Sequence, residues 1–171
     1  GYLRTPGLSI TFLTVPVAVA AMILGPKGGA ICGATFGITS LMQGFGTSAF
    51  GAMLLGINPF GTVFTCIVPR ILEGLLSGLI FKAVRGKNKN LAYFAGGLAC
   101  PVLNTIFYMS SLVLFFYNTD YIQGFVDALG VTNPFAFVVA FVGVQGAIEA
   151  VVCTVVGAAV ARALAAALKE V

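Results

Sequence analysis

Residues 60–84 have the sequence FGTVFTCIVPRILEGLLSGLIFKAV, a run of 25 residues in which apolar side chains predominate. An α-helix rises about 1.5 Å per residue, so this run is longer than the roughly 30 Å hydrocarbon core of a bilayer. Inside it only Arg70 and Glu73 carry a charge, and Lys82 lies near its end. This length and composition predict a helix that crosses a membrane.

The composition of the whole chain agrees with that prediction. Hydrophobic residues make up 59% of the 171 residues and charged residues 8%, with a mean hydropathy of +1.06. A soluble domain carries about 25% charged residues, so soluble, disordered, coiled-coil and nucleic-acid-binding proteins are excluded. Every cysteine lies in an apolar run and none forms a CxxC, so we expect neither a metal site nor a disulfide framework. The cysteines are Cys32, Cys66, Cys100 and Cys153.

Four further apolar segments accompany residues 60–84, at about 9–24, 28–42, 91–117 and 134–168. They predict an all-α integral membrane protein, a compact bundle of five helices that forms one domain over residues 1–171. The first two segments are short and predict a tight helical hairpin, with a kink at Pro16.

Two long connections carry no Lys or Arg, at 43–59 and 118–133. We expect both to fold over a site, because such long connections are seldom simple linkers.

The basic residues predict the orientation in the membrane. They follow the segments at 9–24 and 60–84 or lie near the C-terminus, so by the positive-inside rule that side is cytoplasmic. The C-terminus is then cytoplasmic, and residue 1 lies outside after five spans. An outside start predicts a sixth, preceding helix that this chain lacks. The basic residues concerned are Lys27, Lys82, Arg85, Lys87, Lys89, Arg162 and Lys169.

Polar residues inside the apolar segments are the candidate site, because ionisable groups are costly in a membrane. They form three groups, one on each of three predicted helices, and helical spacing puts the members of each group on one helix face. Counted along the helices, the groups share one layer about 14–22 Å below the outer surface. They predict a pocket open to the outside; the alternative is that the three charged residues neutralise one another and join the helices. The candidates are Arg70 and Glu73, then Asn104 and Tyr108, then Gln145 and Glu149.

Small residues recur every four positions in several segments. In lipid, such ridges let helix backbones approach closely. Those at Gly29, Gly33 and Gly37 and at Gly157, Ala161 and Ala165 are expected to pack within the bundle, with docking of a partner's helices as the alternative for the second group. Tyr93, Tyr117 and Tyr121 are expected at membrane interfaces.

Catalysis is not expected. The chain has no His, and it has no phosphate-binding loop of the kind that ATP hydrolysis requires. An ion channel is disfavoured because no repeated filter or ring of charge is present. We therefore expect no enzyme, no catalytic residue, no metal and no cofactor.

Two stretches resemble a known family of transporter subunits. VPVAVAAMILGPKGGAICGATFGITSL at 15–41 resembles the second and third helices of the S components of energy-coupling factor (ECF) vitamin transporters. IVPRILEGLLSGLIFK at 67–82 resembles their fourth helix, with its P-R-x-x-x-G-x-x-x-G pattern. INPFGTVFTCIVPR at 57–70 and PVLNTIFYMSSL at 101–112 are most similar to pantothenate-specific members.

The resemblance implies a multi-pass subunit in the plasma membrane of a bacterium. It would bind a vitamin in an outer pocket formed by the last three helices, with Arg70 facing the carboxylate of pantothenate. It would work with a transmembrane EcfT-like coupling protein and two cytoplasmic EcfA-like ATPases. The alternatives are another vitamin or precursor, such as hydroxymethylpyrimidine or a pyridoxine-like compound, or a structural membrane subunit that transports nothing.

Overall fold

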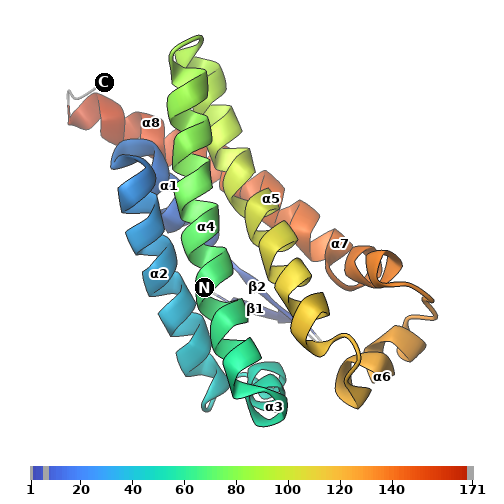
Figure 1. The fold of residues 1–171 in the computed structure, drawn as a ribbon. Coiled ribbons are helices and arrows are strands. Elements are labelled where there is room, and N and C mark those ends of the chain that lie inside the picture. The colour runs from blue at the N-terminus through green and yellow to red at the C-terminus, as the bar shows by residue number, and fades with distance from the viewer. Residues whose placement is uncertain (1, 6–7, 169–171) are drawn as a thin grey trace.

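A computed structural model of the chain describes residues 2–5 and 8–168, with the side chains of residues 12–168. Helices dominate the structure, and a short antiparallel hairpin precedes them (Figure 1). The predicted Lys169 at the basic end lies outside the described residues. The elements are β1 (Tyr2–Thr5), β2 (Leu8–Thr11), α1 (Thr14–Ile23), α2 (Gly25–Gly44), α3 (Ala49–Ile57), α4 (Pro59–Arg85), α5 (Lys89–Phe116), α6 (Asp120–Ala128), α7 (Pro134–Val152), the π-helical turn η1 (Cys153–Gly157) and α8 (Ala158–Ala167).

The predicted all-α membrane fold is confirmed, since each of the five apolar segments contains a helix. Within the described residues, three helices are long and apolar enough to cross a membrane: α4, α5 and the continuous helix Pro134–Ala167. α1 and α2 form the predicted tight pair, which turns at Gly25 with a positive φ of 77° that favours glycine.

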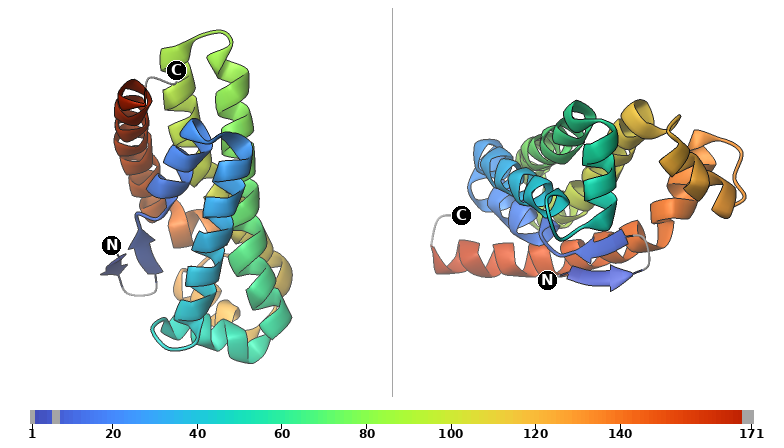
Figure 2. Two further views of the ribbon diagram at one scale, coloured as in Figure 1. Left: turned by 90° about the vertical axis from the view of Figure 1, so that its left-hand side faces the viewer. Right: turned by 90° about the horizontal axis from the view of Figure 1, so that it is seen from below.

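Two predicted details are wrong at the start of α1. The helix begins at Thr14 instead of residue 9, because residues 8–11 form strand β2. Pro16 therefore lies in the first helical turn, where backbone N–H groups have no intrahelical acceptor, so it does not interrupt the helix. Figure 2 shows the strand hairpin alongside the last helix, and β2 contacts α7.

Asparagine and proline determine where the long helices begin. Asn58 accepts a hydrogen bond from the Gly61 amide at 3.0 Å, and Asn133 accepts one from the Ala136 amide at 2.8 Å. The residue after each cap is a proline, which suits the first helical position because that position needs no N–H. These Asn-Pro pairs start α4 and α7 at the end of the molecule that carries α3 and α6 (Figure 1).

Glycines hold α2 against α4. A Cβ atom on Gly37 would lie 2.7 Å from the Cys66 carbonyl oxygen, and one on Gly33 would overlap the carbonyl oxygen of Arg70. Only glycine permits this approach, so the first ridge packs within the bundle, as expected. The second ridge does the same: Ala161 and Ala165 are buried in a core cluster that includes Ala18 of α1.

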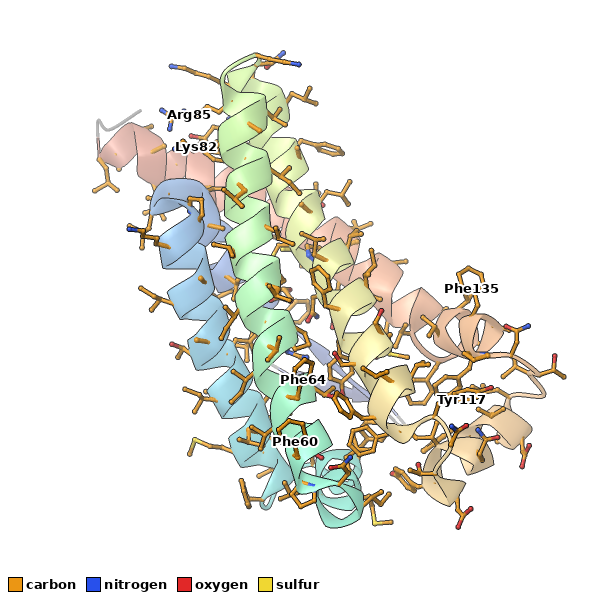
Figure 3. The ribbon with its side chains drawn as sticks, viewed as in Figure 1. Phe60, Phe64, Lys82, Arg85, Tyr117 and Phe135 are labelled. Atoms are coloured by element: carbon orange, nitrogen blue, oxygen red, sulfur yellow. The ribbon has the colours of Figure 1, made fainter. Side chains whose placement is uncertain are left out.

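The two ends of the bundle differ in chemistry. Figure 3 shows Lys82 and Arg85 at one end of α4, and Phe60 and Phe64 toward the other. The loop from α4 to α5 continues the basic end, and α3 and α6 cover the opposite end (Figure 1). The two connections that we expected to fold over a site, residues 43–59 and 118–133, contain the short helices α3 and α6.

Candidate functional site

A cavity of about 440 Å³ opens among α2, α4, α5 and α7, beneath α3 and α6. Its volume falls within the range of about 300–1,000 Å³ that is usual for small-molecule sites. Five of the six predicted site residues line it, drawn from three helices as the helical spacing indicated: Arg70, Asn104, Tyr108, Gln145 and Glu149.

Arg70 is the basic residue among the described residues that line the cavity, and its side chain is 7% exposed. Its Nη1 donates a hydrogen bond to the Thr65 carbonyl oxygen at 3.0 Å. The guanidinium carbon lies 4.3 Å from the ring centroid of Tyr108 and 5.2 Å from that of Phe36. The cation is therefore fixed by α2, α4 and α5 together, through one carbonyl and two aromatic faces.

The sequence left open whether Arg70, Glu73 and Glu149 neutralise one another. In the part of the chain that the structure describes, Arg70 forms no ion pair, and both carboxylate oxygens of Glu73 lack a hydrogen-bond partner. Glu73 is 0% exposed and does not line the cavity. Arg70 and Glu73 thus do not pair, and the positive charge of the cavity stays uncompensated by its neighbour.

Further buried polar atoms of the cavity also lack partners among the described residues. Besides the carboxylate oxygens of Glu73, the buried side-chain atoms without a hydrogen-bond partner are Thr65 Oγ1, Arg70 Nε and Asn104 Oδ1. All three belong to residues that line the cavity. Buried polar atoms are nearly always hydrogen-bonded, so their concentration at one cavity points to a polar ligand there.

The α7 side of the cavity supplies an amide and a carboxylate. Gln145 Nε2 donates a hydrogen bond to Glu149 Oε1 at 3.3 Å, one helical turn along α7. Glu149 is 5% exposed. This pair orients the Gln145 side chain and gives the wall opposite α4 both hydrogen-bond donors and acceptors.

Aromatic residues cover the cavity at the α3 and α6 end. The ring of Phe50 lies 5.9 Å from that of Tyr121 and 6.2 Å from that of Phe125. Both α6 residues line the cavity with Phe50, so Tyr121 is not only an interface residue, as its sequence position had suggested. Tyr93, also expected at an interface, does not line the cavity and is buried against Phe81, with ring centroids 5.2 Å apart. Burial raises the pKa of the Tyr121 phenol, so it stays a neutral hydrogen-bonding group at physiological pH.

Sequence reasoning missed the contributions of α2 and of the hydroxyl residues on α4. Ser40 and Gln43 line the cavity from the end of α2, and Thr62 and Thr65 line it from the start of α4. Their signal was present as polar residues three apart within apolar helices. This spacing is weak evidence for a site, because Ser and Thr hydroxyls also form hydrogen bonds to carbonyls of their own helix. Thr62 does so by donating to the Asn58 carbonyl at 2.9 Å.

The described residues contain no cluster of three or more His, Cys, Asp or Glu that could hold a metal. The side chains that line the cavity suit the reversible binding of a polar ligand. The fixed guanidinium of Arg70 suits an anionic group, and amide and hydroxyl side chains suit a polar chain attached to that group.

Comparison with known proteins gives relatives that match the predicted subfamily. The chain is 36% identical over 106 residues to "Pantothenate transporter PanT" of Leuconostoc mesenteroides, which covers 58% of this chain and 49% of that protein. It is 30% identical over 121 residues to "Pantothenic acid transporter PanT" of Lactococcus lactis, which covers 64% of this chain and 59% of that protein. The chain therefore spans about half of the first relative and about three fifths of the second.

A family model described as "ECF transporter, substrate-specific component" matches residues 1–161. The match confirms the predicted family. Because such a component belongs to a transporter, it also confirms that the chain is not an enzyme. The chain belongs to the family of substrate-specific components of ECF transporters.

Proposed function

We propose that this chain is the pantothenate-binding subunit of an ECF-type importer in a bacterial plasma membrane. It captures the vitamin from outside and releases it inward when docked on an EcfT-like coupling protein with two EcfA-like ATPases. The family, the names of the two relatives and the chemistry of the cavity support this proposal.

The observation that carries the proposal is that Arg70 is buried at the cavity without an ion pair among the described residues. A buried cation without a carboxylate partner favours an anionic ligand, and a guanidinium forms two parallel hydrogen bonds to a carboxylate. Pantothenate carries one carboxylate, one amide and two hydroxyls. Hydroxymethylpyrimidine and pyridoxine carry no carboxylate and leave the cation unpaired.

The remaining cavity residues match the rest of the molecule. Asn104, with its unpartnered Oδ1, and Gln145 accept from and donate to the ligand amide and hydroxyls. Glu149 accepts hydrogen bonds from the hydroxyls, and the ring of Tyr108 holds Arg70 in place. Glu73 lies outside the cavity lining, so its position gives no support to the predicted contact with the ligand.

Equilibrium binding of labelled pantothenate to the purified protein in detergent or nanodiscs tests the substrate. We expect a Kd below about 1 µM, a free energy of about −8 kcal/mol. Tighter binding of hydroxymethylpyrimidine or pyridoxine overturns pantothenate but not the family. If no water-soluble vitamin binds, the binding function itself is overturned.

The orientation of the chain in the membrane is a second part of the proposal. The basic end with Lys82 and Arg85 lies on the cytoplasmic side with the C-terminus, and the cavity end faces outward. In a background with the four cysteines replaced, a cysteine at Lys87 should react with an impermeant maleimide only after permeabilisation. A cysteine at Thr132 should react in intact cells, and the reverse pattern overturns the orientation.

Dependence on partners is the third part. Cells that express the chain together with the coupling protein and both ATPases should accumulate labelled pantothenate, and cells that express the chain alone should not. ATP-independent uptake by the chain alone contradicts this part of the proposal.

A further inference from the structure

Pro69 lies inside α4 directly before Arg70 and is fully buried. In an α-helix the N–H of each residue donates to the carbonyl four residues earlier. Proline has no N–H, so at this position the carbonyl of Thr65 loses its helical donor. An interior proline therefore leaves one acceptor unused within the helix, one turn toward the cavity end.

The side chain of the next residue uses that acceptor. Arg70 Nη1 donates to the Thr65 carbonyl oxygen at 3.0 Å, and the bond is buried. The bond reaches back five residues along the same helix, which no backbone bond of an α-helix does. The proline and the arginine thus act together: one frees the carbonyl and the other binds it.

This bond sets the position of the guanidinium. With Nη1 held by the carbonyl, the planar group lies against Tyr108 at 4.3 Å and Phe36 at 5.2 Å, and Nε has no hydrogen-bond partner in the described part of the chain. Guanidinium has five N–H donors in a rigid plane, so fixing one edge determines where the others lie. The free donors are then held ready for a carboxylate before any ligand arrives.

We propose that Pro69 is a positioning residue that makes the cavity selective for carboxylate ligands. It acts by withholding its N–H from the Thr65 carbonyl, so that this carbonyl orients Arg70. The inference rests on the proposed function, because it concerns how the same cavity recognises the carboxylate of pantothenate.

The test compares pantothenate with its neutral primary amide in the Pro69→Ala variant, which restores the N–H. The backbone then competes with Arg70 for the Thr65 carbonyl. Losing one such bond should raise the Kd for pantothenate about 3- to 10-fold and the Kd for the amide less than about 2-fold. Pro69→Val supplies the same N–H with a side chain closer in volume to proline, in case Pro69→Ala folds poorly.

Two controls separate positioning from packing. Pro101→Ala removes the other buried interior proline of the described helices. The residue after Pro101 is Val102, which has no guanidinium to position, so this variant should leave the ratio of the two Kd values unchanged. In an Arg70→Met background, Pro69→Ala should no longer change that ratio, because the group through which it acts is gone.

The outcomes distinguish this inference from the proposed function. If wild-type protein does not bind pantothenate, the proposed function fails. If it binds pantothenate and prefers the acid to the amide, yet Pro69→Ala weakens both ligands equally, only the role of Pro69 is overturned. An effect on the ratio that persists in the Arg70→Met background also overturns it.

Discussion

The guanidinium carbon of Arg70 lies 4.3 Å from the ring centroid of Tyr108, so the cation of α4 rests on an aromatic face of α5. This contact and the Thr65 carbonyl bond take the place of the acidic partner that a buried arginine usually has. Neither contact neutralises the charge. The site thus holds its arginine in place without an ion pair among the described residues, so the guanidinium stays available to bind an anion.

Replacement of Arg70 separates ligand binding from stability. Arg70→Met should raise the Kd for pantothenate about 10- to 150-fold, the loss of a buried charge-assisted bond of about 1.5–3 kcal/mol. The neutral amide should lose much less. Arg85→Met is the control, because Arg85 lies at the basic end and should leave both Kd values unchanged. Equal losses for acid and amide show that Arg70 does not bind the carboxylate, and a loss confined to stability assigns it a structural role.

The aromatic support of Arg70 gives a second prediction. Tyr108→Leu removes the ring face and should weaken pantothenate binding about 2- to 30-fold, since a cation–π contact contributes about 0.5–2 kcal/mol. Tyr108→Phe keeps the face and should stay within about 3-fold of wild type. Calorimetric titration of both variants measures the difference. Equal losses in Tyr108→Phe and Tyr108→Leu assign the effect to the hydroxyl, which both variants lack.

Glu73 and Asn104 are both buried and both have unpartnered oxygens, but only Asn104 lines the cavity. Glu73→Leu removes an unsatisfied polar group from the interior, so it should keep or raise the melting temperature, by the equivalent of about 1–3 kcal/mol. Its Kd for pantothenate should stay within about 3-fold of wild type.

Asn104→Leu is the matched variant for that prediction. It should fold but lose affinity at least about 5-fold, because it removes a hydrogen bond to the ligand. Loss of binding in Glu73→Leu with the fold intact, measured by thermal melting and titration together, places Glu73 at the ligand after all.

Gly33 tests the contact between α2 and α4. A Cβ atom there would overlap the carbonyl oxygen of Arg70, so Gly33→Ala should lower stability by about 1–3 kcal/mol and weaken pantothenate binding. A Cβ atom on Gly143 of α7 would have open space around it, with no packing contact within 4 Å among the described residues. Gly143→Ala should therefore be neutral or stabilising by about 0.5–1 kcal/mol. Melting temperatures of the two variants should move in opposite directions or differ clearly in size.

Much of the cavity follows from helical spacing alone. Asn104 and Tyr108 are four residues apart, as are Gln145 and Glu149, and each pair lines the same cavity wall. Such pairs stand out because polar residues are rare in these segments, and the length of each segment places them at similar depth.

Other features depend on packing that the spacing does not specify. Glu73 follows Arg70 by three residues, a rotation of about 300°, which leaves the two side chains about 60° apart around α4. That difference is enough to put Arg70 in the cavity and Glu73 in the protein interior. Helices α3 and α6 were expected as loops, because nine-residue helices give too few turns for a clear periodic pattern.

The π-helical turn Cys153–Gly157 changes how the last helix divides its surface. In an uninterrupted α-helix, Glu149 and Ala161 would point about 120° apart, because each residue advances the direction by about 100°. One extra residue in the turn reduces that angle to about 20°. The half that lines the cavity and the half that packs on α1 therefore share a single inward face. The extra residue of the π-helical turn thus realigns the two parts of the last helix. One part can line the cavity and the other can pack on α1, and neither of these two surfaces turns toward the lipid.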